Sequence, residues 1–213
     1  MSKPRSVLKK IAFLQGRRDE VPNQELAVEL VAAQNRAGIQ EIADALHHED
    51  RHIQADCLKV LYEIGYRDPA LVADHVDDFL GLLGSKDNRL VWGAMIALST
   101  VARLKASEIG AHLGEVLSTM EKGSVITIDN GVSVLAAVAA REYRFRNQIT
   151  NFLIQHLKEC RTKDVPQHAE RMLEAIDSSN GARFAEVLKA RLREFNPSQL
   201  RRVQKVLAAA CDS

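Results

Sequence analysis

The chain is poor in the residues that interrupt helices or build sheet-rich cores. Its 213 residues include only five prolines and eleven glycines, and aromatic residues make up 5%. Since proline and glycine break helices, their scarcity leaves room for long ones. Ala, Leu, Val and Ile supply most of the apolar residues, so the composition predicts a core of aliphatic helix faces rather than an aromatic-rich sheet.

The chain also lacks the marks of a secreted or membrane protein. Cysteine occurs three times, at Cys57, Cys160 and Cys211, without a C-x-x-C pair, which is typical of reduced thiols in a cytoplasmic protein. The apolar run from Ile11 to Leu14 is too short for a signal-peptide core. The longest uncharged stretch, Leu90 to Ala102, has thirteen residues, whereas a membrane-spanning helix needs about 20. We therefore expect a cytoplasmic protein that does not enter the membrane.

Charge is distributed unevenly, although the net charge is only +1. Residues 1–18 carry six basic groups and no acidic one, whereas residues 19–80 carry four basic and fourteen acidic groups. Residues 81–140 are balanced, and residues 141–213 carry fourteen basic against nine acidic groups. The two ends of the chain are therefore expected to attract different partners.

A pattern of about 37 residues repeats from Ile39 onward. Each copy contains two apolar stripes with helical spacing, which predicts two helices per copy. The first-helix stripe recurs as Ile39, Ile42, Ala43 and Leu46; Val76, Phe79, Leu80 and Leu83; Leu113, Val116, Leu117 and Met120; Thr150, Leu153, Ile154 and Leu157; and, less regularly, Phe184, Val187 and Leu188. In the second helix one column is leucine in every copy: Leu61, Leu98, Leu135, Leu173 and Leu207.

Residues that can cap a helix precede every second helix. The expected capping positions hold Asp50, Asp87, Ser124, Thr162 and Asn196. Each of these side chains can accept a hydrogen bond from the free amides at a helix start. Because the apolar alignment does not depend on these positions, they support the helix-pair interpretation independently.

Helix, tight turn and helix at this spacing resembles the HEAT-repeat family over residues 39–211. One helix pair cannot cover its own apolar face, so successive pairs must stack. We expect an all-α fold, a right-handed α-solenoid of stacked antiparallel helix pairs that forms a single domain over residues 1–213. About five repeats would follow an atypical N-terminal helix pair in residues 1–38, with one helix over Lys3 to Gly16 and one from Pro22 towards Gly38.

The resemblance implies that the second helices line a concave groove, and a helical wheel indicates which side chains they display there. Trp92 and Ile96, one turn apart, are expected to form an exposed apolar pair beside Tyr62 and Asp129. Tryptophan and tyrosine are frequent among the residues that contribute most binding energy. The other interpretation is that Trp92 packs under a neighbouring loop or against the preceding unit. Charge selection is assigned to four cations: Lys59, Arg171, Arg201 and Lys205.

These features predict a non-enzymatic scaffold that binds another protein through its groove, as a monomer or weak homodimer, without a cofactor or a metal. The sequence contains no phosphate loop, nucleophile elbow or dinucleotide fingerprint. The stretch His48-Glu49-Asp50-Arg51-His52 matches the zinc-binding H-E-x-x-H motif, but a cap at Asp50 leaves His48 and Glu49 in a turn. The other histidines are interpreted as ordinary surface or inter-helix residues: His75, His112, His156 and His168.

The alternative function is nucleic-acid binding, with base excision as one form of it. The HEAT-like alkylpurine DNA glycosylases, which this arrangement also resembles, hold damaged DNA in a concave groove with tryptophans and an aspartate. Trp92 and Asp129 occupy corresponding columns of adjacent units, although the chain has only one tryptophan. The C-terminal basic cluster could contact phosphates or serve as a solvated end cap: Arg191, Arg193, Arg201, Arg202 and Lys205.

Overall fold

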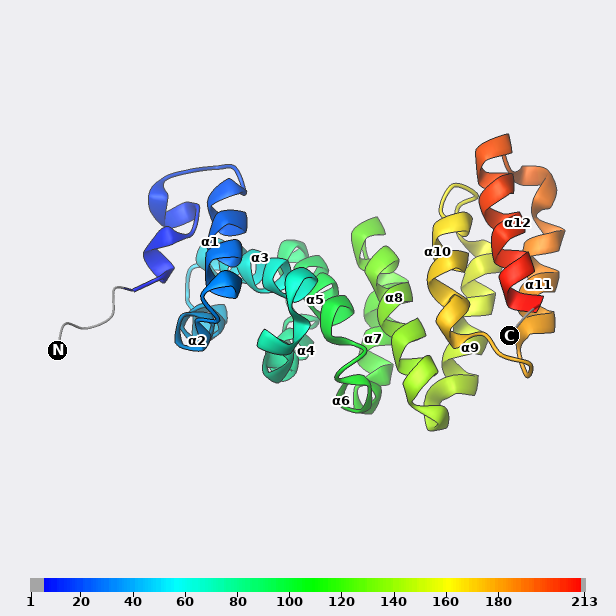
Figure 1. Ribbon diagram of the computed structural model, residues 1–213, viewed down its shortest axis with the longest axis horizontal. Coiled ribbons are helices and arrows are strands. Elements are labelled where there is room, and N and C mark those ends of the chain that lie inside the picture. The colour runs from blue at the N-terminus through cyan, green and yellow to red at the C-terminus, as the bar shows by residue number, and fades with distance from the viewer. Residues whose placement is uncertain (1–5, 212–213) are drawn as a thin grey trace. The chain divides into compact units, whose positions relative to one another are not determined.

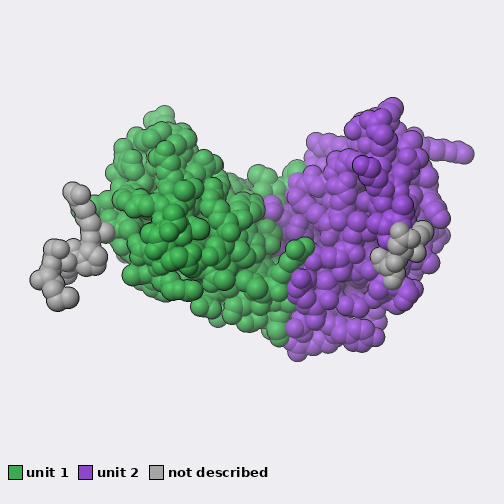
Figure 2. All heavy atoms as spheres, in the orientation of Figure 1, with its two compact units in different colours: residues 1–128 green, residues 129–213 purple. Residues whose placement is uncertain are grey.

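All regular elements in the described part of the protein are helices (Figure 1). The structure, a computed structural model, describes residues 6–211, and no strand occurs among them. The predicted all-α fold is therefore confirmed. The chain divides into two compact units, residues 1–128 and residues 129–213 (Figure 2).

The first unit is built from helix pairs whose second helices pack against one another. Its α3 lies between α1 and α5, and these three follow one another side by side in Figure 1. Short 3-10 turns connect or extend several helices. The elements are η1 (Leu8–Lys10), η2 (Phe13–Gln15), α1 (Val21–Ala32), α2 (Arg36–Asp44), η3 (Ala45–His47), α3 (Arg51–Arg67), η4 (Pro69–Leu71), η5 (Ala73–His75), α4 (Val76–Leu82), α5 (Asn88–Val101), α6 (Ala106–Ala111) and α7 (Leu113–Lys122).

The second unit repeats the same construction. Its α9 packs against α11 and its α10 against α12, so that first helices contact first helices and second helices contact second helices. Helix α8 begins in the first unit and continues into this one. The elements are α8 (Val125–Arg141), α9 (Tyr143–Glu159), α10 (Val165–Met172), η6 (Leu173–Ala175), α11 (Gly181–Ala190), η7 (Leu192–Glu194) and α12 (Pro197–Cys211).

Four of the five predicted caps are confirmed. The Asp50 carboxylate accepts the His52 amide at 2.8 Å, and that of Asp87 accepts the Arg89 amide at 2.9 Å. Ser124 Oγ accepts the Thr127 amide at 3.3 Å. The Asn196 side chain accepts the amides of Ser198 and Gln199, both at 3.0 Å. Each second helix concerned begins at or near its predicted residue.

The predicted cap at Thr162 is wrong. Helix α10 begins only at Val165, and the Thr162 hydroxyl donates to Glu194 at 2.8 Å instead. Pro166 explains the late start, because a proline is accommodated in the first turn of a helix and not further inside it.

The prediction for the N-terminal pair is wrong at its first helix and confirmed at its second. Residues 6–16 form two 3-10 turns instead of one amphipathic helix, and residues 3–5 lie outside the described range. Backbone amides in this segment bond to distant side chains: Ala12 donates to Asn23 Oδ1 at 2.8 Å, and Phe13 to Asp56 Oδ2 at 2.7 Å. The second helix, α1, has Pro22 in its first turn as predicted, and it ends at Ala32 because a new helix, α2, follows the Asn35 cap.

The leucine column points into the core, as predicted, in three of its five positions. Leu61, Leu98 and Leu135 are fully buried, whereas Leu173 and Leu207 are half-buried. Burial of these leucine side chains stabilises the packing of the second helices against their neighbours. Within the described residues, no helix combines the length and the apolar character needed to cross a membrane.

Candidate functional site

The residues predicted to bind a partner divide between the two units. The first unit contains Lys59, Tyr62, Trp92 and Ile96 on α3 and α5, and the second contains Asp129, Arg171, Arg201 and Lys205 on α8, α10 and α12. The two groups therefore have different neighbours.

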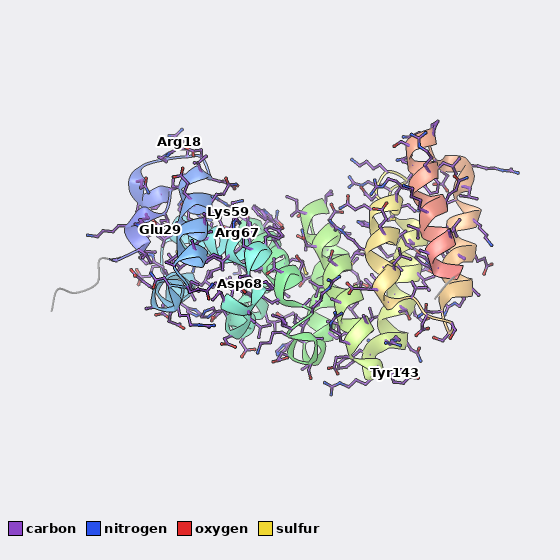
Figure 3. All side chains as sticks on the ribbon, in the orientation of Figure 1. Arg18, Glu29, Lys59, Arg67, Asp68 and Tyr143 are labelled. Atoms are coloured by element: carbon purple, nitrogen blue, oxygen red, sulfur yellow. The ribbon has the colours of Figure 1, made fainter. Side chains whose placement is uncertain are left out.

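The side chain of Lys59 is buried, and its positive charge is already paired with two carboxylates. Its ammonium lies 2.9 Å from Glu20 Oε2 and 2.9 Å from Glu63 Oε1, and it sits over the Tyr62 ring at 4.8 Å from the centroid. Burial alone lowers the pKa of Lys59, but hydrogen bonds to these three partners outweigh it and raise the pKa. The expected display of the Lys59 charge along the groove is therefore wrong, because the side chain is buried; Lys59 is labelled in Figure 3.

The expected exposure of the Trp92–Ile96 pair is wrong at Ile96. Ile96 is 8% exposed, whereas Trp92 is half-buried. Lys59, which shares the column of Ile96, meets Glu20 just before α1, so this column faces the preceding second helix. Trp92 stands one turn earlier on α5 and keeps part of its indole accessible.

Trp92 borders a narrow crevice that shares two of its lining residues with a separate pocket. The crevice, called here the Trp92 surface, is lined by Glu20, Ala55, Leu58, Lys59, Tyr62, Arg89, Trp92 and Gly93. Glu20 and Arg89 also line a neighbouring pocket of about 360 Å³, together with Phe13, Arg18 and His52 among others. A pocket of this volume is large enough for one or two side chains of a partner.

The pocket of about 360 Å³ combines two stacked rings with charged side chains. The rings of Phe13 and His52 stack at 5.1 Å with an interplanar angle of 12°. Arg17 binds Asp19 through two hydrogen bonds, which lowers the pKa of that carboxyl. No ion pair to Arg18 occurs among the described residues, and its exposed side chain is labelled in Figure 3.

In the second unit, the side chains of Asp129 and Arg171 both form hydrogen bonds within the protein. Asp129 Oδ1 lies 2.8 Å from His168 Nε2, and the Arg171 guanidinium donates to the Asp129 carbonyl oxygen. Arg201 and Lys205 of α12 are exposed. Of the four predicted cations, only these two on α12 are therefore exposed.

One group of residues was not predicted to be functional. His156 Nε2 lies 3.0 Å from His168 Nδ1, and the Cys160 thiol lies close by, with the three potential ligand atoms within 4.8 Å of one another. Burial, followed by the charge of His168, lowers the pKa of His156 to about 4, so the imidazole is neutral at pH 7. The only signal in the sequence is the four-residue spacing of His156 and Cys160.

The H-E-x-x-H match does not form a comparable group. His48 lies before α3, where its Nδ1 accepts the Asp50 amide at 2.9 Å, and His52 stacks on Phe13 in the first turn. Within residues 6–211, three potential metal-ligating side chains come together only at His156, Cys160 and His168.

Comparison with solved structures finds helical-repeat proteins at low sequence identity. An engineered protein solved by the Northeast Structural Genomics Consortium has 17% identity and a TM-score of 0.67, with 98% of each chain covered. A designed armadillo repeat protein in complex with the peptide (KR)4 has 14% identity and a TM-score of 0.70, with 88% of this chain and 86% of that one covered. An archaeal HEAT-like repeats protein from Thermococcus onnurineus NA1 has 14% identity and a TM-score of 0.51, with 92% and 98% covered.

No protein-family model matches the chain, and a search of curated proteins also finds no match. The similar structures therefore establish the fold. The chain has the all-α, HEAT-like solenoid architecture that its repeats predict.

Proposed function

We propose that the protein is a scaffold that binds a peptide segment of another protein on the Trp92 surface of its first unit. The observation that carries this proposal is the half-buried, partly accessible Trp92 in a crevice that shares Glu20 and Arg89 with a pocket of about 360 Å³. A partly exposed tryptophan among buried neighbours is typical of residues that dominate binding energy.

Charge favours a basic segment as the partner. Residues 19–80, which form most of this unit's first two helix pairs, carry fourteen acidic and four basic groups. Such an excess attracts a cationic partner over distance. At the surface itself, an arginine could stack on the Trp92 indole, and Glu20, whose side chain is 46% exposed, adds negative charge nearby although it already pairs with Lys59.

The fold is compatible with this mode of binding. The designed armadillo repeat protein of similar fold was solved with a basic peptide, (KR)4. Solenoids present extended surfaces formed by successive second helices, along which a peptide can lie. In this proposal the exposed Arg201 and Lys205 of the second unit contact acidic groups elsewhere on the partner.

In the experiment, an array of peptides is probed with the full-length protein. The basic peptides that bind are then titrated into the protein in solution. Trp92 is the only tryptophan, so its emission reports on the proposed surface directly. Trp92→Ala should weaken binding by about 2 kcal/mol, or roughly 30-fold, as expected for a residue that dominates binding energy. Tyr143→Ala, at an 82% exposed aromatic of the second unit, is the matched control and should bind normally.

Two results would contradict the proposal. One is equal affinity of the wild-type protein and Trp92→Ala for every peptide that binds. The other is tight binding of duplex DNA that falls steeply with salt and does not depend on Trp92, which would favour the nucleic-acid alternative.

A further inference from the structure

Three side chains that can bind a metal meet where α9 and α10 pack together in the second unit. His156 lies in the last turn of α9, and Cys160 is the residue at which that helix ends, so the two project from the same side. His168, from α10, is 1% exposed and brings Nδ1 to 3.0 Å from His156 Nε2. Two imidazole nitrogens and a sulfur therefore surround one point between the two helices.

Asp129 determines which nitrogen of His168 faces that point as an acceptor. The carboxylate lies 2.8 Å from His168 Nε2, which must donate its proton because an ionised carboxylate only accepts. Nδ1 of a neutral His168 consequently carries a lone pair directed at the cluster. Histidines that bind metals usually donate their other ring N–H to a carboxylate in this way, and the carboxylate fixes both tautomer and ring orientation.

The donor set suits zinc. Two neutral imidazoles and a thiolate are ligands that zinc prefers, whereas magnesium and calcium prefer oxygen. Zinc–nitrogen bonds of about 2.0–2.1 Å and zinc–sulfur bonds of about 2.3 Å place tetrahedral donors roughly 3.3–3.6 Å apart. The ligand atoms already lie within 4.8 Å of one another, so side-chain rotations could bring them to these distances.

Access and charge are consistent with a bound cation. His156 and Cys160 are half-buried, so an ion can reach the cluster from solvent, and water would supply the fourth ligand. The negative charges of Asp164, Glu159 and Asp129 act on the His156 imidazole. The Arg191 guanidinium, 3.9 Å from Cys160 Sγ, offsets part of the charge of a thiolate.

We propose that His156, Cys160 and His168 bind a zinc ion, with Asp129 as the residue that orients His168. The ion would connect the end of α9 to α10 and stabilise this helix pair. The site is independent of the peptide-binding surface, because its residues all belong to the second unit.

The test is metal titration of the full chain, reduced and freed of metal by a chelator. Co²⁺ is the first probe, because a thiolate-to-cobalt absorption band identifies sulfur as a ligand, and Zn²⁺ competition then gives the zinc affinity. The wild-type protein should bind one ion, show the band and unfold at a higher temperature with zinc. Cys160→Ala should lose the band, and His156→Ala should bind at least 100-fold more weakly.

Asp129→Asn tests the orienting role, with an expected 10- to 100-fold loss of affinity, roughly the effect known for such partners. His112→Ala, at an exposed histidine of the first unit, is the control that should bind normally. Because His156 and Cys160 are half-buried, their variants should fold, which circular dichroism checks. Absence of the band in the wild-type protein, or unchanged affinity in both Cys160→Ala and His156→Ala, would overturn the proposal.

Discussion

Gly65 of α3 faces Thr100 of α5 across a gap too narrow for a side chain. A Cβ at position 65 would lie 2.8 Å from Thr100 Cβ and closer still to Thr100 Oγ1. A rotation about χ1 could move the hydroxyl, which donates to the Ala97 carbonyl at 2.7 Å, but it cannot move the Cβ atom. Gly65→Ala must therefore push α3 and α5 apart.

The expected free-energy change follows from two opposing effects. Overpacking a close contact costs about 1–3 kcal/mol, whereas alanine stabilises a helix interior by about 1 kcal/mol relative to glycine. Gly65→Ala should therefore destabilise the first unit by roughly 1–2 kcal/mol. Gly81→Ala, where nothing lies within 4 Å of the new Cβ, should instead be neutral or stabilising by up to about 1 kcal/mol. Gly93→Ala should fall between them, because the closest atom is the flexible end of Leu58.

The assay is urea unfolding followed by the emission of Trp92, the only tryptophan, which lies in the same unit as these glycines. Adding Thr100→Gly to Gly65→Ala should recover much of the loss, since it removes all the crowding atoms. Thr100→Ala should recover less, because its Cβ atom remains. Two outcomes would refute the reasoning: a Gly65→Ala protein as stable as Gly81→Ala, or a double variant whose losses simply add.

Three further predictions concern ionisation, thiol reactivity and helix capping. Glu63→Gln should lower the free energy of unfolding by about 1–3 kcal/mol at pH 7. Although burial alone raises the pKa of Glu63, hydrogen bonds from Arg67 and Lys59 lower the pKa overall, so the difference between the variant and the wild type should shrink as the pH falls below 4.5. Urea titrations at several pH values measure this difference. Burial raises the pKa of the Cys57 thiol to about 12, so a thiol reagent should modify Cys57 only as the protein unfolds; rapid modification at pH 7 would contradict its burial. Asn196→Ala should lower the stability of the second unit by about 1 kcal/mol in thermal unfolding, and Asn196→Asp should retain it.

The helix pairs could be predicted because the signals that form them are local. Apolar spacing and capping side chains act within a few residues, and the caps at Asp50 and Asp87 bond only two residues ahead. The N-terminal segment could not be predicted in this way, because its amides bond to Asn23 and Asp56, which are eleven and forty-three residues away. A local pattern carries no information on such partners.

The candidate site was predictable only in part for a similar reason. A helical wheel gives the direction of a side chain around its own helix but not the position of the neighbouring helix. The wheel therefore predicts one accessible face for Trp92, Ile96 and Lys59, whereas Ile96 and Lys59 face the preceding second helix in the structure. The pairing of His156 with His168 depends on how α9 and α10 fold back on each other, which their spacing of twelve residues does not specify.

Internal pairing of charge also limits what the first unit can use for recognition. Lys59 is held by Glu20 and Glu63, Arg17 by Asp19, and the buried carboxylate of Asp56 accepts a backbone amide beside Arg89. Groups already paired gain little from a partner, since each new ion pair requires an existing one to open. Affinity on this surface must therefore come mainly from apolar and aromatic contact at Trp92. The excess of acidic groups in residues 19–80 acts on the rate of encounter, because long-range attraction does not require any existing pair to break.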